Sequence, residues 1–285
     1  METVAIVGVG LIGGSFGLAL RQAGFTGELI GVSSPAAIEA GLESGAIDRA
    51  GTLEEAAATA DVIYLAQPVD RILQTLEILG PIAREACLIT DAGSTKAAIV
   101  RKASEHVRSA TFLGGHPMAG KEHRGAQAAE GRLFAQRPYV LTPSRPENSM
   151  SRQFRSWLGR FDANVLEISP SEHDRIVAFT SHLPQLVSTA LAGTLSTQNS
   201  EGQNSEGISQ VFGPGLLDMT RLALSTPDLW SSILATNKAE ITLAVELFLD
   251  YLNRVKDAID TEDLVRLFNA GTSFAASIRK LPSTS

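Results

Sequence analysis

Short apolar runs alternate with amphipathic stretches along the first half of the chain, and glycine or aspartate stands at most of the junctions. Runs this short and this continuously apolar are typical of parallel strands that are covered on both faces. Helical spacing between the runs predicts crossover helices, so the pattern indicates βαβ units around a mainly parallel sheet. The expected strands span 4–9, 28–33, 61–66, 87–92, 111–116, 137–143 and 164–169, and the expected helices span 15–23, 35–44, 53–59, 69–79, 96–107 and 149–161.

After Pro170 the strand pattern stops, and helical spacing runs through 174–195, through 214–224, and from Pro227 to about Ile259. The last stretch predicts one helix of about 30 residues, whose apolar stripe requires a bundle that is often shared between subunits. We therefore expect an α/β domain over 1–169, an all-α domain over 170–285, and a homodimer formed through the helical domain. A tandem QNSEG repeat at 198–207 predicts a surface loop.

Composition and charge narrow the classes of partner. Apolar residues make up 44% and charged residues 19%, as in ordinary globular proteins. The net charge of −7, from 24 basic and 31 acidic residues, and the lack of a basic tract argue against nucleic acid. The uncharged stretch 3–20 holds five glycines, which favours a buried strand and turn over a membrane span. The single Cys87 permits no disulfide or thiolate metal site and fits a cytoplasmic protein, and we predict no metal.

A glycine-rich turn follows the first expected strand and opens a helix. In such a turn the first glycine allows the tight bend, the second lets the backbone approach a pyrophosphate, and the third lets the helix pack on the strand. This context predicts a dinucleotide-binding, Rossmann-like domain. The predicted cofactor-binding positions of the turn are Gly8, Gly10, Leu11, Ile12 and Gly13.

The end of the second strand bears on the choice between NAD and NADP, because an acidic residue there binds the ribose 2′-hydroxyl and repels a 2′-phosphate. This chain has Ser33 and Ser34 instead. Two hydroxyls and no carboxylate favour NADP modestly over NAD, although an arginine that would hold the phosphate is not evident in this stretch. Capping of the following helix explains the serine pair equally well.

Further polar residues stand where other expected strands end, and the carboxyl ends of parallel strands form one rim of the sheet. His116 ends one strand, Asp91 and Ser94 follow the preceding one, and Gln67-Pro68 follows a third. An imidazole beside a hydroxyl can remove a proton from a substrate alcohol. We predict His116 and Ser94 as the catalytic pair, with Asp91, Gln67 and Pro68 on the cofactor side.

Several motifs together resemble the prephenate/arogenate dehydrogenases of tyrosine biosynthesis, in order and spacing over nearly the whole chain. The motifs are GVGLIGGS at 8–15, DAGSTK at 91–96, GGHPMAGKE at 114–122, SHLP at 181–184, DMTR at 218–221 and PDLW at 227–230. The resemblance implies an oxidative decarboxylation in which a cyclohexadienol gives up a hydride to the nicotinamide, loses CO2 and becomes aromatic.

The resemblance also implies roles for residues of both domains. His116 would be the base at the substrate hydroxyl, Ser94 would hydrogen-bond the same region, and Arg221 would clamp a substrate carboxylate. His182 and Trp230 would line the pocket, with Glu122 at its edge. Taken singly, a surface cation explains Arg221 as well, and packing in the core explains His182 or Trp230.

The chain departs from the family pattern at two substrate-binding positions: Gln185 stands where some members that act on prephenate have histidine, and Leu217 where some have lysine. Cationic side chains repel an ammonium group, so the absence of both favours binding of arogenate. The Gln185 amide can also donate to the keto group of prephenate. Two other functions compete. A lysine-based hydroxyacid dehydrogenase leaves the GGHP motif unexplained, and a nucleotide-sensing protein without catalysis has no use for Ser94, His116 and Arg221 together.

Overall fold

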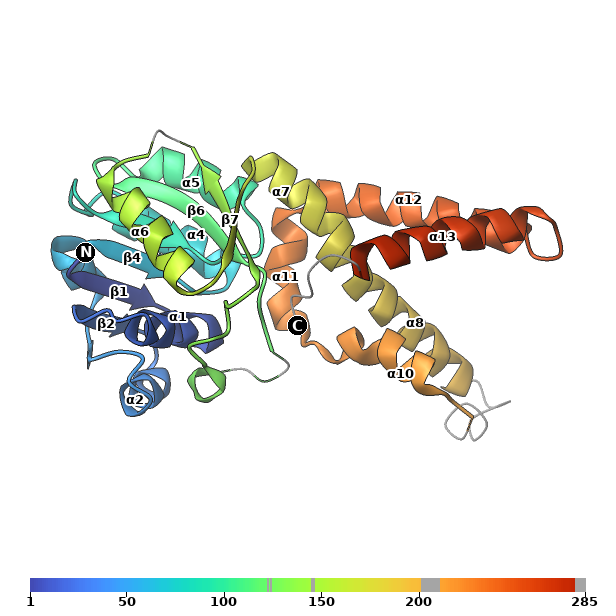
Figure 1. Cartoon of the computed structure of the whole chain (residues 1–285), viewed down its shortest axis with the longest axis horizontal. Coiled ribbons are helices and arrows are strands. Elements are labelled where there is room, and N and C mark those ends of the chain that lie inside the picture. The colour runs from blue at the N-terminus through green and yellow to red at the C-terminus, as the bar shows by residue number, and fades with distance from the viewer. Residues whose placement is uncertain (122, 124, 145–146, 201–210, 280–285) are drawn as a thin grey trace. The chain divides into compact units, whose positions relative to one another are not determined.

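The computed structural model describes residues 1–121, 123, 125–144, 147–200 and 211–279. The chain divides into two compact units, Met1–Asp174 and Arg175–Ser285. The first is the α/β part and the second is helical, so the expected fold class is confirmed (Figure 1). Glu122 and positions 201–207 of the QNSEG repeat lie outside the described residues.

The first unit contains an eight-stranded sheet in the order β3-β2-β1-β4-β5-β6-β7-β8. Every neighbouring pair is parallel except β6 and β7, so the sheet is mainly parallel as predicted. The strands are β1 (Thr3–Val7), β2 (Glu28–Val32), β3 (Arg49–Ala50), β4 (Val62–Leu65), β5 (Leu88–Asp91), β6 (Thr111–Pro117), β7 (Pro138–Pro143) and β8 (Asn164–Glu167). The short strand β3 is absent from the sequence prediction because two residues show no periodicity.

Helices cover the sheet because its strands are apolar on both faces. Helices α1 and α6 share one face, where Phe16 packs against Phe154 at 6.0 Å between ring centroids, and α4 and α5 pack together on the other (Figure 1). Cys87 is buried beside β5, and burial raises the pKa of its thiol to about 12, in keeping with an inert core side chain. The helices are α1 (Leu11–Gln22), α2 (Pro35–Glu43), α3 (Leu53–Thr59), α4 (Val69–Leu79), α5 (Ala97–His106) and α6 (Ser149–Arg160), with a 3-10 turn η1 (Ala126–Ala128).

The described residues of the second unit form helices joined by short connections, and none of them is in a strand. Its elements are η2 (Ala178–His182), α8 (Leu183–Ser200), α10 (Pro214–Thr220), η3 (Arg221–Leu224), α11 (Pro227–Thr236), α12 (Lys238–Asp257) and α13 (Asp263–Arg279), and α7 (Pro170–Val177) leads into it from the first unit. No helix among the described residues is both long and apolar enough to cross a membrane.

Three helix predictions need correction. The predicted helix 227–259 is two helices, because Asn237 leaves helical geometry at φ −124° and ψ 28°. The predicted helix 174–195 starts earlier, at Pro170, and contains a π-helical turn at Ala178–His182. Pro184 follows that turn and has no N–H for a helical hydrogen bond, which favours the local change of pitch. The third correction is α13, a helix of 17 residues that the periodicity did not predict.

Candidate active site

The glycine-rich turn joins β1 to α1 at the point where strand order reverses between β1 and β4. Gly8 has φ +96°, and a Cβ there would lie 2.6 Å from the Ala66 carbonyl oxygen. A Cβ on Gly13 would lie 2.1 Å from the Gly8 oxygen, so helix and strand touch as the motif requires. A Cβ on Gly10 would meet nothing within 4 Å. The N-terminus of α1 therefore faces open space, where a pyrophosphate could be bound.

A cleft of about 880 Å³ opens beside this turn. It unites Gly8 and Gly10 with four other predicted cofactor residues, namely Ser33, Ser34, Gln67 and Pro68. Leu11, Ile12 and Gly13 form the first turn of α1 directly behind it. Among the described residues that line the cleft none is acidic, and Arg71 on α4 contributes a guanidinium that the sequence analysis did not find. The residues present fit a dinucleotide.

Asp91 forms a buried ion pair with Lys96, and both side chains are 0% exposed. The Asp91 carboxylate also accepts hydrogen bonds from the backbone N–H groups of Gly93 at 2.8 Å and Gly115 at 3.1 Å, while Lys96 Nζ donates to the Gly115 carbonyl oxygen at 2.7 Å. Burial lowers the pKa of the Lys96 ammonium, and the negative charge of Asp91 opposes that shift. The pair ties the end of β5 to the end of β6, next to Ser94, which is half-buried in the turn before α5.

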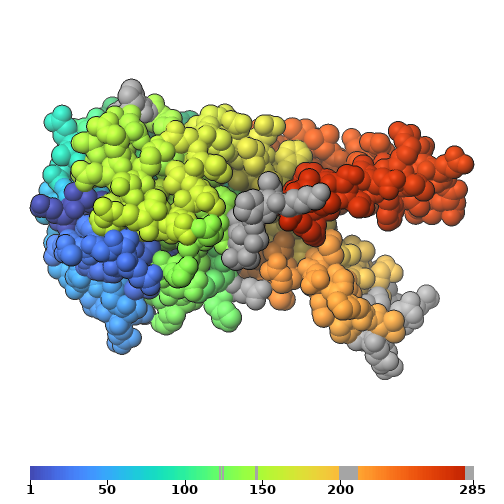
Figure 2. All heavy atoms as spheres, in the orientation of Figure 1, coloured from blue at the N-terminus to red at the C-terminus, as the bar shows by residue number. Residues whose placement is uncertain are grey.

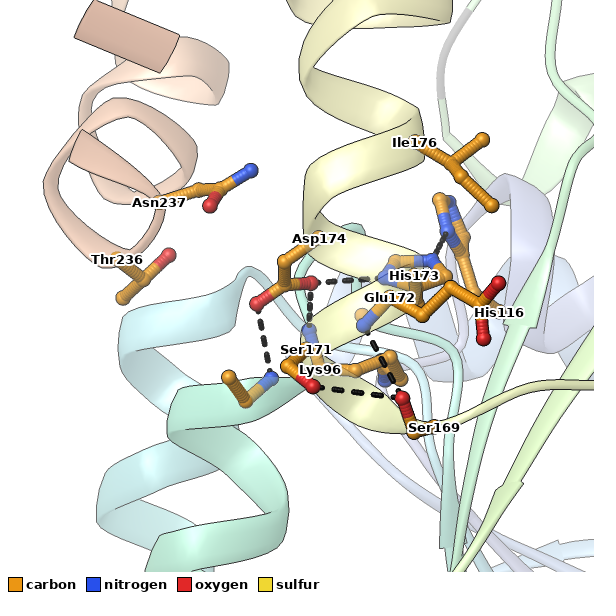
Figure 3. A network of polar contacts seen from close by, with 12 residues as sticks. Lys96, His116, Ser169, Ser171, Glu172, His173, Asp174, Ile176, Thr236 and Asn237 are labelled. Atoms are coloured by element: carbon orange, nitrogen blue, oxygen red, sulfur yellow. Dashed lines mark hydrogen bonds and ion pairs between the residues drawn. The ribbon is translucent and has the colours of Figure 1, made fainter. Parts of the chain in front are cut away.

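His116 lies near the end of β6 and is 9% exposed. Gly115 brings this part of β6 close to β5, since a Cβ there would lie 2.6 Å from the Asp91 carbonyl oxygen. His116 Nδ1 lies 2.8 Å from His173 Nε2, and His173 Nδ1 lies 2.7 Å from Asp174 Oδ1 (Figure 3). The three side chains form a continuous polar chain within the first unit.

The Asp174 carboxylate is held in turn by the start of α5. Its two oxygens accept hydrogen bonds from the backbone N–H groups of Lys96 at 2.7 Å and Ala97 at 2.9 Å. His173 and Asp174 are 0% and 3% exposed. Sequence analysis missed both residues, because they stand 57 positions or more from His116; the adjacent histidine and aspartate in the first turns of a helix are the only signal in the sequence.

Two predicted substrate residues of the second unit lie together. His182 is 1% exposed, and its ring packs edge-on against Trp230 at 5.9 Å between ring centroids. The amide nitrogen of Asn237, at the break between α11 and α12, lies 3.3 Å from His182 Nδ1. The indole N–H of Trp230 is buried and meets no hydrogen-bond acceptor within the described part of the chain. An indole without an acceptor is unusual for a residue that only fills a core.

Gln185 is 5% exposed, and its amide nitrogen donates to the Leu222 carbonyl oxygen at 2.8 Å and to Thr189 Oγ1 at 3.2 Å. A backbone carbonyl can only accept, so the NH2 group is committed to the protein and the amide oxygen is the atom left to face a ligand. Arg221, the residue before Leu222, begins η3 and is exposed. Leu217, on α10, is 58% exposed.

In comparisons with known proteins, each half of the chain matches a domain model of one family. Residues 16–165 match the model for the nucleotide-binding domain of prephenate dehydrogenase, and residues 169–270 match the model for its dimerization domain. The chain belongs to the prephenate dehydrogenase family. Its members are oxidoreductases. The match to the nucleotide-binding domain begins just after the glycine-rich turn and includes Ser33, Ser34 and Arg71 of the cleft.

Individual relatives agree with this membership. The chain is 34% identical to the prephenate dehydrogenase of Bacillus subtilis over 273 residues, which cover 94% of this chain and 72% of the relative. A prephenate dehydrogenase from Aquifex aeolicus, solved with hydroxyphenyl propionate and NAD+, superposes with a TM-score of 0.89 at 29% identity and covers 99% of both chains. The arogenate dehydrogenase of Synechocystis superposes with a TM-score of 0.82 at 30% identity, over 98% of this chain and all of that one.

Proposed function

We propose that this prephenate dehydrogenase family member oxidises and decarboxylates prephenate, and also arogenate, with NADP+ as the favoured acceptor. The observation that carries the proposal is His116, held by a buried polar chain at the strand ends of the unit that contains the dinucleotide cleft. The experiment is an assay of both substrates with both nicotinamide cofactors, followed by the absorbance of the reduced cofactor. Absence of turnover in all four combinations would refute the proposal.

In this mechanism the bound nicotinamide supplies the acceptor for a hydride. His116 accepts the proton of the substrate hydroxyl, so that a carbonyl forms as the C–H bond breaks. The ring carboxylate leaves as CO2, its bonding electron pair passes through the ring to the carbonyl oxygen, and that oxygen takes the proton back from His116 to become the phenol hydroxyl. The Ser94 hydroxyl hydrogen-bonds the same oxygen. Arg221 binds a substrate carboxylate with its two-pronged guanidinium. Trp230 and His182 supply the wall of the pocket, which gives the buried indole N–H a ligand acceptor.

The preference for NADP+ is supported by the wall of the dinucleotide cleft. Ser33, Ser34 and Arg71 line it together, and a guanidinium with two hydroxyls is a suitable set of donors for a 2′-phosphate. Asp91 would act from behind the cleft, through the strand ends that it holds together.

Replacement of Arg71 by alanine is expected to raise the KM for NADP+ by about tenfold or more, because a charge-assisted contact contributes about 1.5–3 kcal/mol. The KM for NAD+ should stay within about twofold, since NAD+ has no phosphate at that position. Arg101→Ala, an exposed arginine on α5 outside the cleft, is the control. Equal losses with both cofactors, or a wild-type preference for NAD+ above about a hundredfold, would contradict this assignment.

Gln185 is proposed to contact the substrate side chain and to affect the preference between arogenate and prephenate. Because its NH2 group is bonded to Leu222 and Thr189, its oxygen offers an acceptor that suits the ammonium of arogenate. We expect kcat/KM for arogenate no worse than about tenfold below that for prephenate, and Gln185→His should shift the ratio towards prephenate. Gln198→His, on the exposed side of the same helix, is the matched control. An undetectable arogenate reaction would refute the electrostatic argument, and an unchanged ratio would show that Gln185 does not face the side chain.

A second copy of the chain is the proposed partner of the helical unit, as the name of its family domain suggests. Helices α12 and α13 expose large apolar side chains, including Leu247 at 49%, Leu252 at 50%, Phe268 at 64% and Phe274 at 68%. The surface of these helices is orange to red in Figure 2. An exposed apolar face of this kind is typical of a subunit interface. Sedimentation should give a mass of twice 30.2 kDa. The proposal includes a cytoplasmic location, which a chain with a single cysteine and therefore no internal disulfide fits.

A further inference from the structure

The hydrogen bonds from His116 through His173 to Asp174 run in one donor-to-acceptor direction, and the Asp174 carboxylate determines that direction. The oxygens of the Asp174 carboxylate accept from the backbone N–H groups of Lys96 and Ala97, and Oδ1 also faces His173 Nδ1. An ionised carboxylate only accepts hydrogen bonds. His173 must therefore be the donor in this contact and carry a proton on Nδ1.

The next contact follows from the first. A neutral imidazole with its proton on Nδ1 has a lone pair on Nε2, so His173 Nε2 accepts at the 2.8 Å contact. The donor is then His116 Nδ1, which leaves the lone pair of His116 on Nε2. A doubly protonated His173 would reverse this contact, but it would place a cation on a ring that is 0% exposed.

We propose that His173 and Asp174 are positioning residues that hold His116 in the tautomer with its proton on Nδ1, so that Nε2 is the atom that accepts the substrate proton. The inference deepens the proposed function and rests on it for the role of His116. The chain also fixes the ring in place, since His116 and His173 meet edge to face at 67° between ring planes. Catalysis by a histidine needs the lone pair on the correct nitrogen as well as the ring at the correct place.

The tautomers can be measured directly, without any substrate. In protein labelled with ¹⁵N at histidine, the ring nitrogen shifts distinguish a protonated Nδ1 from a protonated Nε2, and His116→Asn and His173→Gln assign the signals. We expect both His116 and His173 to carry the proton on Nδ1. A wild-type His116 with its proton on Nε2 would overturn the inference, even if the enzyme proved active.

The kinetic test uses Asp174→Asn, which keeps the size of the side chain but replaces one acceptor by a donor. In a serine protease triad the equivalent change lowers kcat about 10⁴-fold because the histidine takes the wrong tautomer. Here a second imidazole separates the carboxylate from the catalytic histidine, so we expect a smaller loss than in that triad, although kcat should still fall at least about 30-fold. The KM for NADP+ should stay within about twofold of the wild-type value. Glu172→Gln is the matched control, because it removes the same charge from the same helix at an exposed position.

A double variant distinguishes a purely structural role of Asp174 from a role that acts through His116. If Asp174 acts through His116, then Asp174→Asn adds no further loss of kcat to His116→Asn, since residues that act as a unit are not additive. An additional loss in the double variant would overturn the inference, as would a kcat for Asp174→Asn equal to that of Glu172→Gln. If wild-type protein turned over neither substrate, the proposed function would fail, while the nitrogen shifts would still decide the tautomer.

Discussion

Replacement of His116 by asparagine is expected to lower kcat by about 10²–10⁴-fold, the usual contribution of a general base. Asparagine is of similar size and its amide can still donate to His173 Nε2, so the surroundings of β6 should persist. It cannot take up a proton at neutral pH, and the loss should therefore fall on the chemical step. Steady-state kinetics with prephenate and NADP+ measure the effect.

Cofactor binding gives the internal control for His116→Asn, because the dinucleotide cleft is lined by other residues of the first unit. We expect the Kd for NADP+ to stay within about twofold of the wild-type value. His106→Asn, a half-buried histidine at the end of α5, is the matched variant and should leave kcat unchanged. A His116→Asn enzyme that kept more than about a tenth of the wild-type kcat would remove His116 from the role of base.

Replacement of Lys96 by methionine is expected to cost about 3–5 kcal/mol of unfolding free energy, because it leaves the Asp91 carboxylate buried without its counter-ion. For a unit of this size the loss corresponds to a fall in Tm of about 6–20 °C, at about 2–4 °C per kcal/mol. The Gly115 carbonyl also loses the donor that lies 2.7 Å away. Calorimetry or denaturant unfolding measures the change.

Lys102→Met is the matched control, since Lys102 lies on α5 and pairs with Glu77 at the surface, with the two side chains 25% and 50% exposed. An exposed pair contributes about 0–1 kcal/mol, so this variant should unfold nearly as wild type does. Adding Asp91→Leu to Lys96→Met should recover part of the stability, because both buried charges are then gone. Equal unfolding of Lys96→Met and Lys102→Met would show that Asp91 does not depend on its partner.

The sequence by itself determined the family, the mainly parallel sheet and the place of the dinucleotide turn. Short, continuously apolar runs mark the strands and helical spacing marks the helices, and both patterns are local. Gly8 and Gly13 occupy positions where a Cβ would strike backbone atoms. His116 was found for a related reason, because the carboxyl ends of parallel strands share one rim whatever the order of the strands.

Only the tertiary structure decided which residues from distant parts of the chain contact the predicted site residues. Arg71 enters the cleft with Ser33 and Ser34 because strand order places β4 next to β1, and no spacing along the chain encodes that order. Asn237 divides a stretch whose apolar stripe is continuous, and its side chain contacts His182, which lies 55 positions away. Tertiary packing likewise brings His173 to His116 and Asp174 to the start of α5. Periodicity reports neighbours three or four residues apart, whereas contacts between distant segments depend on how the finished elements pack.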